Sequence, residues 1–264
     1  MKLDLLGTLY FVGTAGSGKS TLVDAYKQFL DSSSINSATV NMDPAVVTLP
    51  YNPDFDIRDY VSMKSLLESE PLGPNGAIIA AMDIAVTRIP ELAKEVKDAD
   101  PDYVLVDTPG QLELFVFRAA GPLVVDMLTE GKKASCFLMD PLLADDAASL
   151  ASLFLFSAST SLRLGIESIN VMSKADKAPP DLAQRISEYI ADPSGFYELL
   201  TKRGGLMNTL SARLVETALE VANYAEPVAV SSYTRSGIDF LHASVQRIFS
   251  GGEVEEPGGE EEDD

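Results

Sequence analysis

A glycine-rich octapeptide near the N-terminus constrains this chain more than any other feature. Residues 13–20 read Gly-Thr-Ala-Gly-Ser-Gly-Lys-Ser. They follow an apolar run, Leu6–Val12, which predicts a short buried strand, and they precede apolar residues at helical spacing from Leu22 to Leu30. A strand, a glycine-rich turn and a helix N-terminus form a cradle for phosphates, because backbone N–H groups and the positive end of the helix dipole face the anion. The sequence therefore predicts a nucleoside triphosphate site at this turn.

The residue types within the loop predict separate roles. Lys19 is expected to reach the β and γ phosphates, and the Ser20 hydroxyl is expected to bind Mg²⁺. The backbone N–H groups of Gly16, Gly18 and Lys19 are expected to face the phosphates. A chance match in a glycine-rich turn is the alternative, and the patterns on both sides argue against it. The other predicted nucleotide contacts of the loop are Gly13, Thr14, Ala15, Ser17 and Thr21.

Strand-like runs alternate with helical patterns along the chain, and most of them end in a polar residue. This alternation predicts an α/β, three-layer P-loop NTPase fold, with a mostly parallel sheet covered by helices on both faces. Ligands of such sheets bind outside the carboxyl ends of the strands, where the polar residues are expected. The runs are Leu6–Val12, Ala38–Met42, Tyr103–Val106, Ala134–Met139, Ile169–Met172 and Pro227–Val230, and the polar residues are Asp43, Asp107, Asp140, Ser173 and Ser231.

The chain divides into one nucleotide-binding domain, residues 1–250, and an acidic tail, residues 251–264. Helical inserts are expected near 55–97 and 178–224. The tail has eight acidic residues and no basic one, which predicts disorder and leaves −12 of the net charge of −20 on the body. A surface this acidic argues against direct nucleic-acid binding, because phosphates are repelled.

The first insert contains a sharp turn between two helical patterns. Helices are expected around Tyr60–Ser69 and from about Ala77 to Val96, with the turn at Gly73-Pro74-Asn75 between them. A plain helix-to-helix connection and a ligand-contacting loop are both compatible with this pattern.

Composition excludes several classes of site. Cys136 is the only cysteine, so no intramolecular disulfide forms, which fits a reducing, cytoplasmic compartment. His242 is the only histidine, which excludes a multi-histidine metal site and a serine–histidine triad. The apolar stretch 150–166 carries several polar residues and is short for a bilayer span, and the N-terminus lacks a signal-peptide pattern, so no membrane association is expected.

The run Tyr103–Val106 leads into Asp107-Thr108-Pro109-Gly110. An aspartate at such a strand end is expected to accept from waters or from Ser20 in the Mg²⁺ shell. The Gly110 N–H is expected to meet the γ phosphate and so to sense its presence. A plain Pro-Gly turn is the alternative.

Three further polar residues are candidates for hydrolysis. Gln111 is placed to hold the attacking water, and Glu113 to accept a proton or fix the glutamine. A polar first turn of the next helix is the alternative for both, and the helix dipole favours Glu113 there. Asp43, followed by Pro44, is expected to bind Mg²⁺ or to position the nucleophile, with a turn-capping aspartate as the alternative. Asp56 and Arg58 fit either a switch region or a surface ion pair.

The segment Ser173-Lys174-Ala175-Asp176 follows the run Ile169–Met172 and predicts guanine recognition. The Asp176 carboxylate can accept from N1–H and the exocyclic amine of guanine, and the Lys174 stem can pack on the ring. Adenine would leave the carboxylate unpaired. The first position is serine where asparagine is usual in such elements. The segment Ser231-Ser232-Tyr233, at the end of the last run, is expected to offer a backbone N–H to guanine O6.

Taken in order, these motifs resemble the GPN-loop GTPase family, a dimerising SIMIBI class of P-loop GTPases, over roughly residues 7 to 250. The resemblance implies GTP or GDP with Mg²⁺ as ligands and a homodimer whose sites face each other. It implies that Asn75 contacts the partner's phosphate site. It also implies that Asp43, Gln111 and Glu113 act around Mg²⁺ and the hydrolytic water. Eukaryotic members are linked to RNA polymerase assembly and transport, which makes such an enzyme or an assembly factor a candidate client.

Two other functions compete with a GTP-hydrolysing switch. A nucleotide or polynucleotide kinase shares the phosphate loop, but its lid usually needs clustered arginines, and those of this chain are scattered. A scaffold that binds nucleotide without turnover would use apolar surfaces such as 153–156, a segment that equally fits a core helix.

Overall fold

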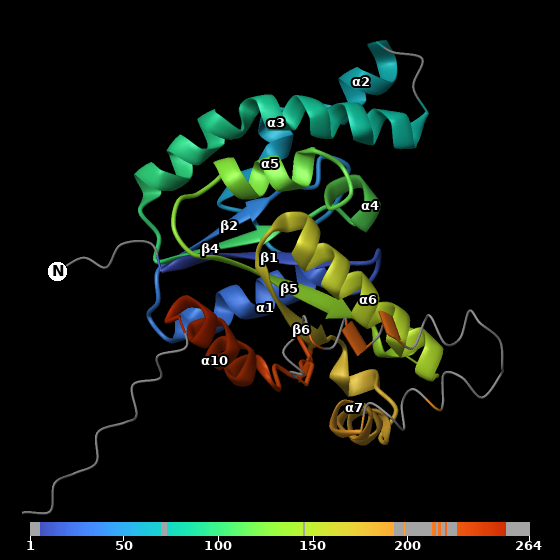
Figure 1. Cartoon of the computed structure of the whole chain (residues 1–264). Helices are drawn as coiled ribbons and strands as arrows, with labels where there is room; N and C mark the ends of the chain where they lie inside the picture. The colour runs from blue at the N-terminus through green and yellow to red at the C-terminus, as the bar shows by residue number, and fades with distance from the viewer. Residues whose placement is uncertain are drawn as a thin grey trace, which may run out of the picture.

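The computed structural model describes residues 6–69, 73–144, 146–192 and 226–251, together with positions 198, 213, 214, 216, 217 and 220. Its centre is a seven-stranded sheet in the order β3-β2-β4-β1-β5-β6-β7 (Figure 1). Every neighbouring pair is parallel. The strands are β1 (Gly7–Gly13), β2 (Ser37–Asn41), β3 (Phe55–Asp56), β4 (Tyr103–Asp107), β5 (Lys133–Met139), β6 (Glu167–Met172) and β7 (Val228–Ala229).

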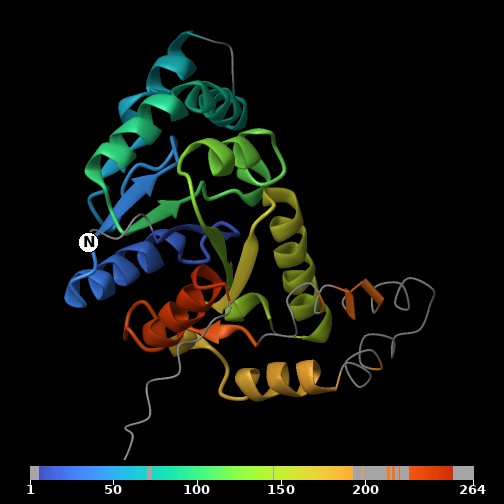
Figure 2. The ribbon, with the colours of Figure 1, turned by 60° about the vertical axis from the view of Figure 1, so that its left-hand side comes forward.

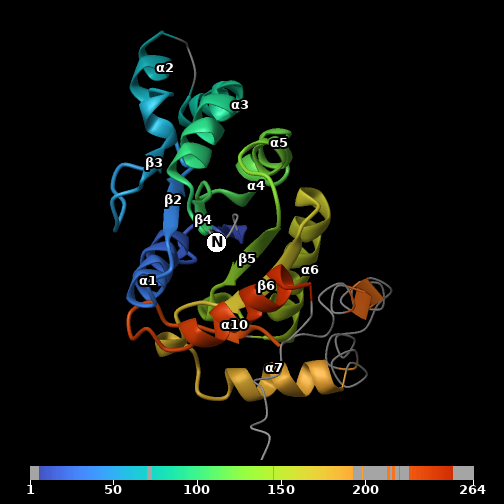
Figure 3. The ribbon, with the colours of Figure 1, turned by 90° about the vertical axis from the view of Figure 1, so that its left-hand side faces the viewer.

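Helices cover both faces of this sheet (Figures 1 and 3). One face packs against α1 (Lys19–Ser32) and α10 (Ile238–Phe249). The other face packs against α3 (Pro74–Ala99), α4 (Leu112–Phe115), α5 (Ala120–Met127) and α6 (Ala147–Leu164). The prediction of a three-layer α/β fold is confirmed. The remaining elements are α2 (Met63–Ser69), α7 (Leu182–Ala191) and the short 3-10 helices Ile57–Asp59, Pro141–Leu143 and Ala175–Lys177.

The central strands are buried on both faces, which is why they are continuous apolar runs. Along β1, Tyr10 and Val12 pack into the core on the α3 side, and Leu9 and Phe11 pack into the core on the α1 side. Side chains alternate between faces along a strand, so an unbroken apolar run fills both cores. This burial fixes the strand ends, and with them the loops that carry the polar residues.

All six predicted runs form strands, and no strand end lies more than two residues from its expected position. The two helices expected in the insert near 55–97 are present as α2 and α3. The insert begins, however, with β3, which pairs with β2 through Val40–Phe55 and Asn41–Asp56 and continues into a 3-10 helix. A strand of two residues is too short to produce a periodic pattern, so its pairing partner defines it.

The turn expected at Gly73-Pro74-Asn75 is wrong, because α3 already begins at Pro74. Gly73 precedes the helix in extended conformation, and its carbonyl accepts from Ala77 N at 2.9 Å. Proline suits the first helical position, where its missing N–H would be unpaired in any case. Asn75 therefore lies in the first turn of a 26-residue helix.

Two predicted segments lie wholly or partly outside the described residues. Of the insert 178–224, the structure describes α7 and little beyond Asp192, and of the acidic tail it describes only Gly251. Helix α6 is long and apolar enough to cross a membrane by length and composition alone. In the fold it packs on β5 and β6 through side chains such as Leu153 and Phe154.

Candidate nucleotide site

The phosphate loop joins β1 to α1 and depends on its glycines. Gly16 and Gly18 have φ of 78° and 96°, a left-handed conformation that side chains disfavour. A Cβ on Gly13 would lie 2.8 Å from both the Leu138 carbonyl oxygen and Ser17 Oγ. The predicted strand–turn–helix arrangement is therefore present, with the turn held tightly against β5.

Lys19, the first residue of α1, lies almost fully buried within this loop. Its Nζ donates to the carbonyl oxygens of Gly13 at 2.9 Å and Thr14 at 3.0 Å. Burial lowers the pKa of Lys19, while the carboxylates of Asp107 and Asp43 act to raise it. The two carbonyls that hold this buried ammonium carry no negative charge. A bound phosphate would supply that charge, so the ammonium is suited to bind phosphate.

Asp107 ends β4 and is only 1% exposed. Its Oδ2 accepts from Tyr51 Oη at 3.1 Å, and its Oδ1 is buried without a hydrogen-bond partner in the structure. Burial raises the pKa of Asp107 to about 6, against the opposing effects of the Ser20 and Tyr51 hydroxyls and of Lys19. A buried carboxylate oxygen that lacks a partner, with a serine hydroxyl beside it, has the oxygen chemistry that Mg²⁺ binds.

Within the part of the chain that the structure describes, no three His, Cys, Asp or Glu side chains cluster as a self-sufficient metal site. This agrees with the preference of Mg²⁺ for one or two carboxylates completed by substrate phosphates and waters. The predicted metal residues Ser20, Asp43 and Asp107 thus fit a nucleotide-bound ion.

Asp43 links the loop after β2 to the loop after β4. Its Oδ2 accepts from Gly110 N at 3.2 Å, and its Oδ1 accepts from Ala45 N at 2.9 Å. Gly110 N is the donor expected to sense the γ phosphate. In this structure the Gly110 N–H already donates to the negatively charged Asp43 carboxylate, which indicates that this N–H is placed to bind an anion.

A network that the sequence did not reveal fixes the Asp43 loop. Asn41, buried at the end of β2, accepts from Asp43 N at 3.0 Å and donates to Asp56 Oδ1 at 2.8 Å. Arg58 binds both oxygens of Asp56 and donates through Nη1 to the Val46 carbonyl at 3.0 Å. Asp56 and Arg58 form the predicted ion pair, which is only partly exposed and fastens this loop to the sheet; their part in a switch region stays a prediction.

Gln111 and Glu113 follow Gly110 but are not joined to each other by any hydrogen bond among the described residues. Gln111 precedes α4, and its carbonyl accepts from Leu114 N at 3.1 Å. Glu113 is exposed in the first turn of α4, where the helix dipole favours an acidic side chain. Their catalytic roles stay predictions.

The segment after β6 lies against the phosphate loop. Ser173 donates to the Met139 carbonyl through N at 2.9 Å and through Oγ at 3.1 Å. Lys174, with φ of 51°, pairs with Asp140 through Nζ and Oδ2 at 2.6 Å. Lys174 Cε lies 3.9 Å from the position that a Cβ on Gly18 would take. The base-recognition and phosphate-binding elements therefore meet at one edge of the sheet.

Ser231 supports Asp176 differently from what the sequence suggested. Its Oγ donates to Asp176 Oδ1 at 2.6 Å and accepts from Thr234 N at 3.1 Å. Its backbone N–H is already paired, since it donates to the Ser236 carbonyl at 3.0 Å, and a bond from another N–H of the segment Ser231-Ser232-Tyr233 to guanine O6 stays a prediction. The hydroxyl instead orients the Asp176 carboxylate, which is exposed and free to meet a base.

Asn75 is not part of this cluster within its own chain. Its side chain is exposed and makes no hydrogen bond with the described residues. Figure 2 shows α2 and the beginning of α3 projecting beyond the sheet. The role of Asn75 in a partner's site stays a prediction.

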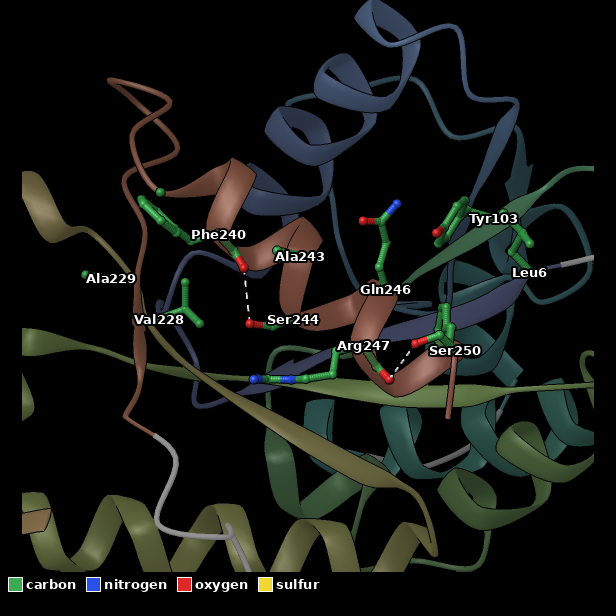
Figure 4. A pocket seen from close by; sticks show the side chains of 12 residues that line it. Leu6, Tyr103, Val228, Ala229, Phe240, Ala243, Ser244, Gln246, Arg247 and Ser250 are labelled. Carbon is green, nitrogen blue, oxygen red and sulfur yellow. Dashed lines mark hydrogen bonds between the residues drawn. The ribbon is translucent and has the colours of Figure 1, made fainter. Parts of the chain in front are cut away.

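A separate hollow lies beside α10 and shares no residue with the phosphate loop (Figure 4). Its volume is about 1190 Å³, and Phe240 and Arg247 are among the side chains that line it. Most of its lining is apolar, so it does not resemble a phosphate site.

Comparison with known proteins agrees with this geometry. A family model described as "Conserved hypothetical ATP binding protein" matches residues 11–251. GPN-loop GTPase 1 of Schizosaccharomyces pombe is 30% identical over 90% of this chain and 67% of its own length. GPN-loop GTPase PAB0955 of Pyrococcus abyssi is 29% identical over 88% of this chain and 92% of its own length. The chain spans 58% of the length of GPN-loop GTPase 1 of Dictyostelium discoideum, to which it is 29% identical.

The crystal structure of PAB0955, a GTPase in apo form, superposes with a TM-score of 0.84 at 27% identity. The alignment covers 94% of this chain and 99% of that one. The family model's description names ATP, whereas these relatives are named GTPases, and the exposed Asp176 carboxylate held by Ser231 suits guanine. The chain belongs to the GPN-loop GTPase family and is a GTP-binding and GTP-hydrolysing enzyme.

Proposed function

We propose that this GTPase is a Mg²⁺-dependent homodimeric switch, located in the cytoplasm, that serves the assembly of a larger complex. The observation that carries the proposal is the convergence of Lys19, Asp107, Asp43 and Gly110 at one edge of the sheet. A protein client such as RNA polymerase or an assembly factor follows from the family resemblance alone. The single buried cysteine, Cys136, is compatible with a reducing compartment.

The metal part of the proposal rests on the free buried oxygen of Asp107. Ser20, Asp107 and Asp43 would hold Mg²⁺, which when bound neutralises phosphate oxygens and polarises the γ phosphorus. Lys19 would add a second positive charge at the β and γ phosphates. Gln111 would orient the attacking water, as the family resemblance implies.

The switch part rests on the bond from Gly110 N to Asp43 Oδ2. One N–H cannot serve both this carboxylate and a γ phosphate, so arrival of the phosphate would free Asp43. The released carboxylate would become available to water or metal. The loop that carries Asp43 would move when the carboxylate is released. Because Val47 lies in the same loop, its position would depend on the bound nucleotide.

Exposed apolar side chains near the same edge support a dimer. Val47 is 91% exposed and follows β2, and Leu142 and Leu143, 62% and 49% exposed, follow β5. Exposed apolar groups beside a site are typical of an interface. The start of α3 lies at the side of the molecule toward which β4 and β5 point (Figure 1), and Asn75 belongs to the first turn of this helix.

Asp43→Ala and Gln111→Ala are expected to lower the kcat of GTP hydrolysis by roughly a hundredfold or more, the usual effect of removing a group that acts on the attacking water. Affinity for a non-hydrolysable GTP analogue is expected to change little, because both residues lie away from the α and β phosphates. Phosphate release and calorimetry measure the two quantities. Arg88→Ala, which breaks an exposed ion pair on α3, is the control. Parental turnover in either variant would remove that residue from the mechanism.

Asn75→Ala is expected to reduce hydrolysis while leaving the fold and the dimer intact, if the residue acts on the partner's site. Mixing it with a Lys19→Ala chain tests this directly. One site of the heterodimer then combines an intact phosphate loop with an intact Asn75, so partial recovery of phosphate release is expected. Absence of recovery, with subunit exchange verified by native mass spectrometry, would mean that Asn75 acts within its own chain or only structurally.

A further inference from the structure

The segment between β2 and β3 places a tyrosine hydroxyl on the carboxylate of Asp107. Tyr51 Oη donates to Asp107 Oδ2 at 3.1 Å, while the Tyr51 ring packs against the core beneath α1. A phenol is protonated at neutral pH, so Tyr51 acts as a neutral donor.

The two oxygens of Asp107 are in different environments. Oδ2 is occupied by Tyr51, whereas Oδ1 is buried and has no partner in the structure. A hydrogen bond to one oxygen restricts rotation of the carboxylate and so fixes the direction of the other oxygen. Because the phenol carries no charge, it leaves the attraction of Asp107 for a cation intact, which a lysine at this position would not do.

The position of Tyr51 is set by the sheet. Three residues later, Asp54 Oδ2 accepts from Thr39 N at 2.8 Å and from Thr39 Oγ1 at 2.9 Å. Asp54 N donates back to Thr39 Oγ1 at 3.0 Å. Thr39 is buried in β2, next to β4, so this anchor ties the tyrosine to the strand pair that carries Asp107.

We propose that Tyr51 is a positioning residue for the metal: its hydroxyl holds Asp107 so that Oδ1 remains available to the Mg²⁺ that accompanies GTP. The inference rests on the Mg²⁺ dependence proposed above and adds a residue that the motifs do not include. A purely structural role, in which the ring only covers the core, requires the ring and not the hydroxyl.

Tyr51→Phe separates these roles, because it removes only the hydroxyl. Calorimetry with a non-hydrolysable GTP analogue, with Mg²⁺ and with EDTA, gives the factor by which Mg²⁺ strengthens binding. That factor is expected to fall about tenfold in Tyr51→Phe, the usual effect of losing a hydrogen bond to a charged group, with affinity in EDTA unchanged. Tyr26→Phe, which loses a 2.8 Å bond to His242 away from the site, is the matched control and is expected to keep the parental factor.

Thermal unfolding of each variant verifies folding. Should Tyr51→Phe not fold, Asp54→Asn, which loosens the anchor but keeps the phenol, is expected to lower the factor in the same direction by a smaller amount. An unchanged or larger factor in the folded variant overturns the role of Tyr51, and a larger one means that the phenol obstructs the metal. No strengthening by Mg²⁺ in the parent would instead refute the metal part of the proposed function, and the inference with it.

Discussion

Lys19→Ala is expected to weaken binding of a non-hydrolysable GTP analogue by at least a hundredfold. Lys19 is 6% exposed and its ammonium is held by two loop carbonyls, so the loop is built around this charge. Removing one partner of a buried, hydrogen-bonded charge pair costs about 3–5 kcal/mol, which corresponds to more than two orders of magnitude in affinity. Isothermal titration calorimetry in the presence of Mg²⁺ measures the effect directly.

Lys27→Ala is the matched control for this experiment. Lys27 lies on the same helix, but it is partly exposed and pairs with Asp31 one turn later. Its removal takes the same charge from the chain without touching the loop, so the affinity is expected to stay within twofold of the parent. Parental affinity in Lys19→Ala would mean that the loop does not bind the triphosphate.

Asp176→Asn is expected to abolish most of the preference for guanine. A site built to hydrogen-bond a base rejects an analogue lacking those groups by about 10⁴- to 10⁵-fold, because polar groups that the bound base covers are left unpaired. Asparagine replaces one acceptor oxygen by a donor, so GTP is expected to bind more weakly and xanthosine triphosphate more strongly. Displacement of labelled GTP by GTP, ATP and xanthosine triphosphate measures all three affinities.

Two comparisons control this result. Asp239→Asn makes the same chemical change at an exposed position in the first turn of α10 and is expected to leave the base preference unchanged. Ser231→Ala removes the hydroxyl that holds Asp176 Oδ1 and is expected to weaken the guanine preference partially. Equal displacement by ATP and GTP in the parent would contradict guanine recognition altogether.

The sequence predicted those parts of the fold that depend on local pattern. The central strands are apolar along their whole length because both faces are buried, and the phosphate loop requires glycines at positions 16 and 18 because of their left-handed φ. Both constraints can be recognised in the sequence without knowledge of the contacts between distant residues. The polar residues at the carboxyl ends of the strands follow from the parallel topology.

The parts that the sequence did not predict depend on contacts between distant segments. Tyr51 reaches Asp107 across 56 positions, and Asn41 reaches Asp56 only because β3 pairs with β2. Nothing in the spacing of these residues distinguishes them from ordinary loop and strand positions. The start of α3 at Pro74 was missed for a different reason, since Gly-Pro-Asn favours both a turn and a helix N-terminus.

The burial of Asp107 means that protons would compete with Mg²⁺ for this carboxylate at the proposed metal site. With a pKa of about 6, about half of the molecules carry a proton on this carboxylate at pH 6, and few do at pH 8. A cation that binds the ionised form must displace that proton, so its apparent affinity weakens as the pH falls through 6. Nucleotide loading at mildly acidic pH would then release protons into the buffer, in an amount that calorimetry in buffers of different ionisation enthalpy can count.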